Sequence, residues 1–142
     1  MGETREVIVE GTPVSVNSHG ANYNRWKEKV RETAYDAISE DDKLGSLEFP
    51  LVALQLFYFA QDESQLDLDN IAKAILDGIT GPLLSDDSQI VGLCMRRVAL
   101  RSFVATQEHP AALRSAVMVA ATNQSEFILI RAKPDDWDGV FQ

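Results

Sequence analysis

The sequence predicts an α/β (α+β) fold, a single domain in which a mixed β-sheet packs against two or three helices. The first observation behind this prediction is the alternation of strand-like and helix-like segments, in the order β-α-β-α-β-α-β, along 142 residues. The second is that this length, with 45% hydrophobic residues, suits one domain with a buried core. The third is the nearly continuous apolar run over 51–60, typical of a central strand covered on both faces. We therefore expect residues 1–142 to form one domain.

The first part of the chain predicts a strand, a loop and a helix. Residues 5–9 are rich in β-branched residues and end at Gly11 and Pro13, which indicates a short strand. Residues 13–20 combine Pro, Ser, Asn and Gly without a helical period, and we interpret them as a loop. Apolar residues then recur every four positions, which predicts a helix over 23–38. The recurring residues are Trp26, Val30, Ala34 and Ile38.

The rest of the chain predicts two further helices and two further strands. Asn70 or Asp69 can cap a helix that ends before Gly81, and Pro110 suits the first turn of another helix. The expected elements are a helix over 70–79, a turn over 85–88, one long strand or a hairpin over 90–103, a helix over 110–121, a strand over 126–132 and a peripheral acidic tail over 133–142.

The charge balance and the single cysteine limit the functions open to the chain. Asp and Glu number 22 and Lys and Arg number 13, which gives a formal net charge of −9. This balance excludes a generally basic protein that coats nucleic acid, although it does not exclude a local basic patch. Cys94 alone excludes an intrachain disulfide and a multi-cysteine zinc site, and we expect it to be a small core residue. No apolar run approaches the ~20 residues of a membrane span, and no hydrophobic signal segment is present. We expect a cytoplasmic protein without membrane contact.

Four carboxylates and one lysine form the most informative group in the sequence. Asp67 and Asp69 are two residues apart, which on an extended segment places both side chains on one face. Lys73 follows Asp69 by four residues and returns to the same side of a helix. Asp86 and Asp87 join this group if the strand after them starts near the end of the preceding one. Such a cluster repels itself, and a hard divalent cation such as Mg²⁺ resolves that conflict.

A divalent cation held beside a phosphodiester predicts nuclease-type chemistry, in which Lys73 offsets the charge that develops on the phosphate. Two other acidic motifs fail. An EF-hand loop that starts at Asp67 requires an oxygen ligand and then a glycine where the chain has Ile71 and Ala72. A haloacid-dehalogenase phosphatase requires threonine at the position of Ile71. The chain also lacks a glycine-rich phosphate loop of the Walker type.

The two acidic segments, with their spacing, resemble the signature of the RusA family of Holliday junction resolvases. That signature resembles Asp-x-Asp-Asn-x-x-Lys, followed by Asp-Ala/Gly-Leu/Ile at the end of a helix and then by Asp-Asp-x-Gln-Ile/Val. The dense match covers residues 67–90. Residues 13–17 also resemble a Pro-x-Ser-x-Asn loop near the N-terminus of the family.

The resemblance implies a RusA-like fold and a homodimeric endonuclease, dependent on Mg²⁺ or Mn²⁺, that makes paired nicks in four-way DNA junctions during recombination and repair. It implies that Asp67, Asp69 and Asp87 are metal ligands and that Lys73 is a catalytic or phosphate-facing cation. Asp86 is a neighbouring candidate ligand, because one sequence does not tell which of Asp86 and Asp87 points inward. A two-fold assembly also suits paired cuts, which need two active sites.

An acidic protein that binds DNA depends on local cations. The candidate DNA-binding residues are Asn17, Arg25, Lys27, Lys29, Arg31, Arg96 and Arg97. Asn70 either caps the helix or holds the metal-binding carboxylates in place without binding the metal itself. We expect Asp77 to be the salt-bridge partner of Lys73. The alternative function is a non-catalytic protein of the same fold that binds DNA or a basic protein. The net charge of −9 supports this alternative, whereas the intact acidic set opposes it.

Overall fold

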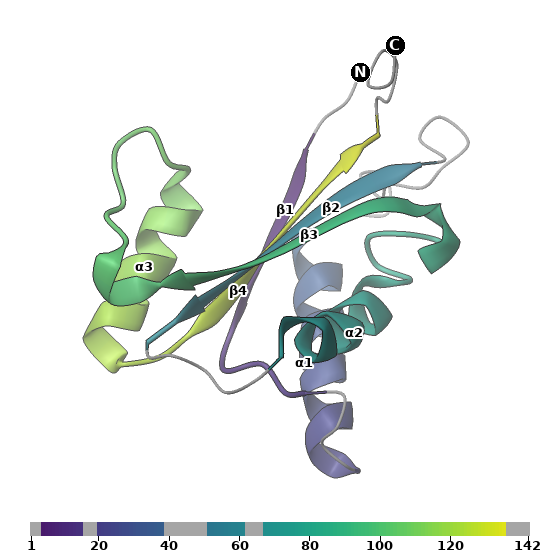
Figure 1. Cartoon of the computed structure of the whole chain (residues 1–142), viewed down its shortest axis with the longest axis horizontal. Coiled ribbons are helices and arrows are strands. Elements are labelled where there is room, and N and C mark those ends of the chain that lie inside the picture. The colour runs from purple at the N-terminus through teal and green to yellow at the C-terminus, as the bar shows by residue number, and fades with distance from the viewer. Residues whose placement is uncertain (1–3, 16–19, 39–50, 62–66, 136–142) are drawn as a thin grey trace.

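A computed structural model describes residues 4–15, 20–38, 51–61 and 67–135 as one mixed four-stranded sheet packed with three helices, a single-domain α+β fold that confirms the prediction. The strands lie in the order β1-β4-β2-β3, with β2 and β3 parallel and the other pairs antiparallel (Figure 1). The strands are β1 (Arg5–Glu10), β2 (Val52–Ala60), β3 (Ile90–Ala99) and β4 (Phe127–Pro134), and the helices are α1 (Ala21–Ala37), α2 (Leu68–Ile79) and α3 (Ala111–Asn123). Two 3₁₀ turns, η2 (Asp87–Gln89) and η3 (Leu100–Ser102), flank β3.

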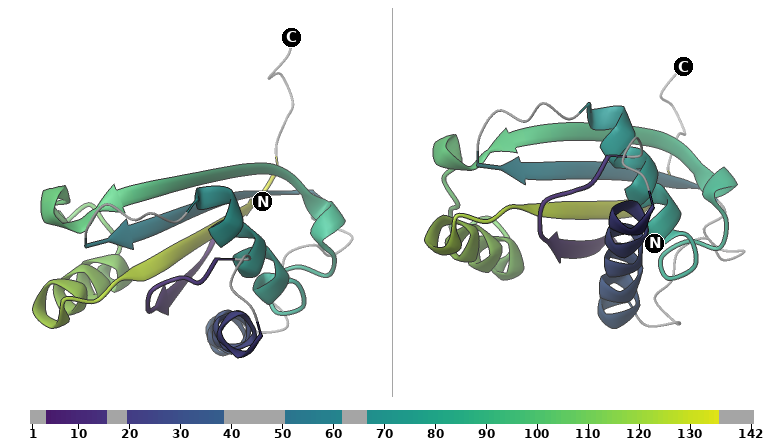
Figure 2. Two further views of the ribbon diagram at one scale, coloured as in Figure 1. Left: turned by 60° about the horizontal axis from the view of Figure 1, so that its bottom comes forward. Right: turned by 90° about the horizontal axis from the view of Figure 1, so that it is seen from below.

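The sheet has a different helical cover on each face. Because side chains alternate along a strand, Leu54, Leu56 and Tyr58 of β2 join the core formed with α1 and α2, whereas Phe57 and Phe59 join a second cluster beneath α3. Figure 2 shows α1 and α2 together under one half of the sheet and α3 at the opposite end. The apolar run over 51–60 therefore forms an internal strand with apolar contacts on both faces, as the sequence predicts.

Helices α1 and α2 pack closely against each other. Helix α2 presents Ile71, Ile75 and Ile79 to the core, and all three are fully buried. A Cβ atom at Gly78 would lie 2.7 Å from Cγ1 of Val30 in α1, so only glycine permits this approach of the two helices. The close contact fixes the orientation of α2, which carries three of the predicted site residues.

The structure corrects two local predictions and decides between two alternatives for a third. Helix α2 begins at Leu68 with Asp67 at the N-cap, not at Asn70 or Asp69, because several adjacent residues are good caps and Leu68 packs against the core. Of the two alternatives predicted over 90–103, the structure confirms the single strand, β3, which is followed by η3, and not the hairpin. Cys94 is exposed rather than buried, because β3 is an edge strand and α3 packs against the far end of that face.

The ends of the remaining elements follow the prediction with small shifts. The strand predicted over 126–132 extends to Pro134, so the first two residues of the predicted tail belong to β4, and residues 136–142 lie outside the described part of the chain. The turn predicted over 85–88 contains η2. No helix in the described part of the chain is long and apolar enough to cross a membrane.

Candidate functional site

The first predicted pair of carboxylates lies at the N-terminus of α2. Asp67 is the N-cap residue, Asp69 lies in the first helical turn, and both are exposed. Leu68 between them packs against the core, which holds the start of the helix in place. Negative charge is favourable at this end of a helix because the first backbone N–H groups point outward there. The two side chains are therefore fixed at their backbones and open to solvent at their oxygens.

Lys73 lies one turn after Asp69, and its amine is directed along the helix to Asp77. The distance from Nζ of Lys73 to Oδ1 of Asp77 is 3.4 Å, which confirms the predicted salt bridge. The other oxygen of Asp77 accepts a hydrogen bond of 2.7 Å from the hydroxyl of Tyr23 in α1. Burial, followed by this hydrogen bond, raises the pKa of Tyr23 to about 12. Asp77 thus links Lys73 to the contact between α1 and α2.

The second pair of carboxylates lies in the turn before β3. Oδ1 of Asp86 accepts a hydrogen bond of 3.0 Å from the backbone N–H of Ser88, and this bond lowers the pKa of the Asp86 carboxyl. The Gln89 side chain accepts from the backbone N–H of Asp86 at 2.9 Å, so Asp86 and Gln89 form a capping box around η2. Asp87 is exposed and lines a shallow hollow with Leu76. Asp86 therefore has a local structural role, whereas Asp87 faces an open depression.

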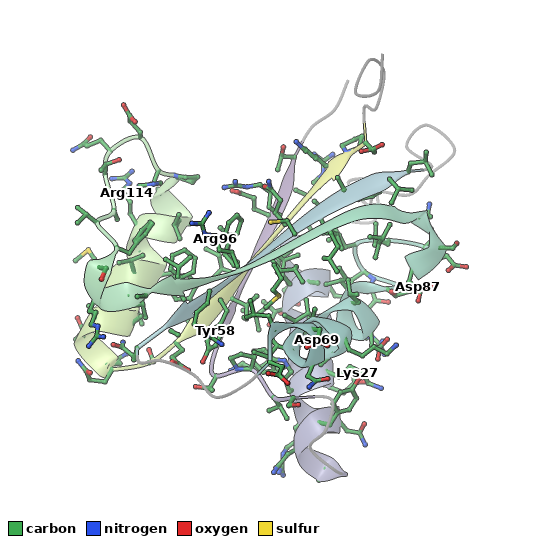
Figure 3. All side chains as sticks on the ribbon, viewed as in Figure 1. Lys27, Tyr58, Asp69, Asp87, Arg96 and Arg114 are labelled. Carbon is green, nitrogen blue, oxygen red and sulfur yellow. The ribbon has the colours of Figure 1, made fainter. Side chains whose placement is uncertain are left out.

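The two pairs do not converge within one chain. Strands β2 and β3 are parallel and start side by side, with Val52 in register with Ile90. Helix α2 begins after the end of β2 and runs back toward that start, so Asp67 and Asp87 lie at opposite ends of a 12-residue helix, about 18 Å long. Figure 3 shows Asp69 and Asp87 well apart on the α2 side of the sheet. The condition for convergence, that β3 starts near the end of β2, is therefore not met within the single chain, and in the described ranges no three Asp, Glu, His or Cys side chains form a possible metal site.

The donor chemistry at the start of α2 nevertheless fits a hard divalent cation. Mg²⁺ is usually held by one or two carboxylates, with waters and substrate phosphates completing its coordination. Asp67 and Asp69 offer two exposed carboxylates. These two residues are the set that fits Mg²⁺ or Mn²⁺.

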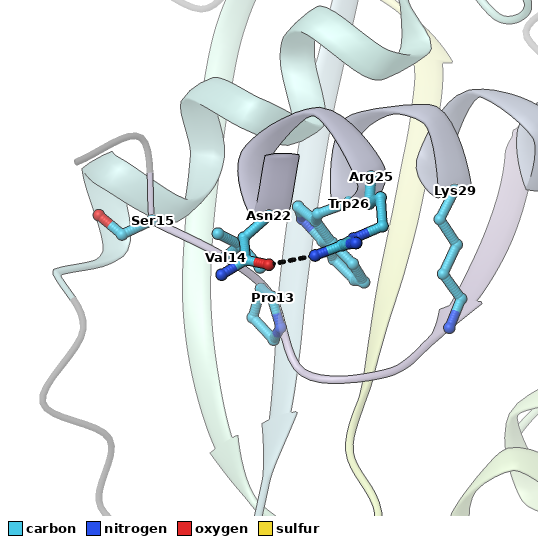
Figure 4. A pocket seen from close by; sticks show the side chains of 7 residues that line it. All are labelled: Pro13, Val14, Ser15, Asn22, Arg25, Trp26 and Lys29. Carbon is cyan, nitrogen blue, oxygen red and sulfur yellow. Dashed lines mark hydrogen bonds between the residues drawn. The ribbon is translucent and has the colours of Figure 1, made fainter. Parts of the chain in front are cut away.

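A basic pocket of about 400 Å³ lies between α1 and the loop that follows β1 (Figure 4). Arg25 and Lys29, one helical turn apart, contribute its cations, and the buried Trp26 forms part of its wall. Pro13 and Ser15 of the predicted Pro-x-Ser-x-Asn loop line the same pocket. The chain that leaves β1 passes the first turn of α2 in both Figure 1 and Figure 2. The basic pocket is therefore on the same side of the molecule as the Asp67–Asp69 pair.

The other predicted DNA-binding residues are placed differently. Arg31 donates to the backbone carbonyls of Asp77 at 2.7 Å and Gly78 at 3.4 Å and so stabilises the end of α2. Lys27 lies over the Tyr23 ring, with Nζ 5.8 Å from its centroid. The two arginines of β3 point to opposite faces of the sheet, and Asn17 lies outside the described residues.

Sequence reasoning missed Arg131, which lies near Arg96 on the face opposite α1 and α2. Both arginines line one pocket, although 35 positions separate them in the sequence. A signal was available in the charge distribution. Residues 1–87 contain 17 Asp and Glu against seven Lys and Arg, whereas residues 88–134 contain two against six.

Comparison with known proteins identifies one family. The model of a family described as endodeoxyribonuclease RusA matches residues 6–110, which span β1 to the residue before α3. The match includes both acidic pairs, Lys73 and the basic pocket. A comparison with curated proteins gives no match.

Proposed function

The chain belongs to the endodeoxyribonuclease RusA family, and on this basis we propose that it resolves four-way DNA junctions by paired, symmetric cuts in recombination and repair. The observation that carries this proposal is the family match over 6–110, because it contains the complete acidic set and Lys73. Family membership implies a nuclease that acts on DNA. The four-way substrate, the paired cuts and the dependence on a metal ion are the parts that we propose.

Asp67 and Asp69 are the proposed ligands of Mg²⁺, or of Mn²⁺. When bound, such an ion polarises the phosphodiester and activates the attacking water. The two carboxylates hold it at the exposed start of α2, where a DNA strand can approach without displacing the core. Hydrolysis would leave a 5′-phosphate and a 3′-hydroxyl.

Lys73 is the proposed phosphate-facing cation. Its amine lies one helical turn from Asp69, and its pairing with Asp77 is exposed, so exchange of this partner for a DNA phosphate costs little. Tyr23 holds Asp77 from the other side, which keeps this carboxylate in place when Lys73 moves. Asn70, half-buried in the first turn, is proposed to support the carboxylates.

Asp87 is the proposed third carboxylate, and we propose that it joins the Asp67–Asp69 pair only in the assembled complex. The separation within one chain is the reason, because the two groups lie at opposite ends of α2. The local capping role of Asp86 favours Asp87 over Asp86 as the ligand.

A homodimer is proposed because paired cuts need two active sites. The outer edge of β3 supports a contact between two copies, since no described strand pairs with it. Val91 and Leu93 are 41% and 49% exposed on this strand. Unpaired strand edges with exposed apolar side chains readily pair with another chain.

The proposed DNA contacts on the catalytic side are Arg25 and Lys29 in the basic pocket, with Lys27, Arg31 and Asn17 near them in sequence. A pocket with two cations beside an acidic pair suits a phosphate group that flanks the cut bond. Arg96 and Arg97 are proposed to contact DNA from the two faces of β3.

Cleavage of a labelled four-way junction, compared with a linear duplex of matched sequence, tests the proposal. The wild type in Mg²⁺ should nick opposite strands of the junction alone, and EDTA should stop the reaction. Asp69→Asn should bind the junction without cutting it. Asp36→Asn, the same substitution at an exposed position of α1, is the matched control and should cut normally.

The alternative function is a non-catalytic DNA- or protein-binding regulator of the same fold. The observation that favours it is the acidic excess of residues 1–87, a surface suited to a basic protein partner. It predicts binding without cleavage in Mg²⁺ and in Mn²⁺.

A further inference from the structure

A second pocket lies on the sheet face opposite α1 and α2. It has a volume of about 380 Å³ and lies between the sheet and the segment that leads into α3. Its walls include Arg96 of β3, Arg131 of β4 and the rings of Phe57, Phe103 and His109. In Figure 3, Arg96 lies toward the α3 end, whereas Asp69 and Asp87 lie on the α2 side. The pocket, which we call the arginine–aromatic pocket, is therefore separate from the proposed cleavage site.

Strand register places the two arginines on neighbouring rows of this face. Arg96 is in register with Phe57, and Arg131 is in register with Gln55, one row along the same face. The guanidinium of Arg131 lies 5.7 Å from the centroid of the Phe57 ring, and its Nε donates to Glu6 at 2.7 Å. Arg131 is thus held in position by two contacts. Arg96 is exposed, and no residue of the described ranges pairs with it.

The aromatic side of the pocket consists of rings that are only partly covered. Phe103 meets Phe59 edge to face at a centroid distance of 5.2 Å, and it lies 5.3 Å from the His109 ring. The backbone N–H of Thr106 donates to Nδ1 of His109 at 2.9 Å, which fixes the ring in the loop. Phe57 and Phe103 are both half-buried, so each retains some exposed ring surface.

Most residues that line this pocket belong to a segment whose net charge is opposite to that of the rest of the chain. Residues 88–134, which form β3, α3 and β4, contain six Lys and Arg and two Glu, within a chain of net charge −9. Helix α3 contains Arg114 and no acidic residue. An anion that approaches the molecule is therefore attracted to this end.

We propose that the arginine–aromatic pocket binds an unpaired nucleotide of a DNA strand, with its phosphate on Arg96 and its base against Phe57 and Phe103. Partly exposed rings combined with an unpaired arginine are the elements by which proteins hold single-stranded nucleic acid without sequence preference. A base within a duplex is stacked on both faces and does not offer a free face to a ring. This inference rests on the proposed function in that the ligand is DNA, and it adds a second strand contact remote from the cut.

Binding of fluorescently labelled oligothymidylate, measured by anisotropy in EDTA at low salt, tests this inference without cleavage. Arg96→Gln should weaken binding about tenfold or more, and Phe103→Leu should weaken it about fivefold or more, as loss of one stacking contact does. Lys133→Gln is the matched control, because it removes one charge from an exposed position of the same face outside the pocket. It should change the dissociation constant less than about twofold. Thermal unfolding followed by circular dichroism verifies that each variant is folded, and Arg96→Lys provides a second variant that keeps the charge.

Equal losses for Arg96→Gln and Lys133→Gln would overturn the inference, because binding would then depend on charge alone. Duplex binding that depends on Arg96 but not on Phe103 would also overturn it. Junction cleavage by the wild type, measured in parallel, separates this inference from the proposed function. A wild type that binds oligothymidylate through Arg96 and Phe103 but does not cut a junction supports the pocket and contradicts the nuclease proposal. If the wild type cuts junctions and neither variant changes oligothymidylate binding, the nuclease proposal is supported and the pocket inference is overturned.

Discussion

The two ends of this molecule differ in charge, in packing and in proposed chemistry. Among the described residues, the α1–α2 end carries the predicted site carboxylates and a core of 21 buried residues, whereas the α3 end carries the excess of arginines and a cluster of seven. Helix α3 also leaves Met118 and Val119 exposed, at 70% and 41%. The difference teaches that a protein of net charge −9 can still keep a local excess of arginines apart from its carboxylates, because the sheet places Arg96 and Arg131 on the face opposite α1 and α2.

The largest expected effect on stability comes from the same Leu→Ala substitution made at two positions. The two positions lie on adjacent strands and face opposite sides of the sheet. Leu56 and Leu129 are 0% and 2% exposed, and they face the α1–α2 core and the α3 cluster, respectively. Leu56→Ala should lower the free energy of unfolding by about 4 kcal/mol and Leu129→Ala by about 2–3 kcal/mol, since a site near the edge of a small cluster collapses more readily. Urea denaturation measures both values. An equal loss of unfolding free energy at the two sites would show that the two ends do not differ in packing.

A smaller effect is expected where α1 crosses α2. Gly78→Ala introduces a methyl group 2.7 Å from Cγ1 of Val30 and 3.1 Å from the carbonyl oxygen of Lys27. We expect a loss of about 1–3 kcal/mol in the free energy of unfolding, because the helices must separate. The control is Gly92→Ala in β3, where the nearest atom, Cβ of Ala53, lies at 3.8 Å. Similar urea midpoints for the two variants would contradict a tight helix contact at Gly78.

The polar link between α1 and α2 gives the smallest expected change and a dependence on pH. Tyr23→Phe removes the hydrogen bond to Asp77, which should cost about 1 kcal/mol at neutral pH. Because burial and Asp77 raise the pKa of Tyr23 to about 12, its contribution is complete below pH 10 and is lost as the pH rises through 12. Wild-type stability should therefore fall over pH 10–12 more steeply than that of Tyr23→Phe. Parallel pH curves would show that this hydrogen bond does not stabilise the fold.

Local patterns were sufficient to predict the elements of the fold. The four-residue spacing from Trp26 to Ile38 predicted α1, and the apolar run over 51–60 predicted β2. The start of α2 was placed two residues late, because Asp67, Asp69 and Asn70 all suit a cap and only the burial of Leu68 decides between them. Residue spacing therefore predicts the type of an element better than its first residue.

The candidate site required information that is not local. Whether Asp87 meets Asp69 depends on the direction of β3 relative to β2. Because these strands pair in parallel, the two aspartates lie at opposite ends of α2. The exposure of Cys94 depends on strand order in the same way, because β3 is at the edge of the sheet. The proximity of Arg131 to Phe57 arises because β4 inserts between β1 and β2.

The most direct test of the proposal that the α2 carboxylates carry out the cleavage is the single-turnover cleavage rate of a bound four-way junction for Asp69→Asn and Asp36→Asn. Loss of a metal ligand should reduce the rate more than about 100-fold, since even groups that only support a ligand cost about 10- to 100-fold. We expect this loss for Asp69→Asn with an unchanged dissociation constant for the junction, and a wild-type rate for Asp36→Asn. Cleavage by Asp69→Asn at the wild-type rate would contradict the assignment of the α2 carboxylates to the chemistry.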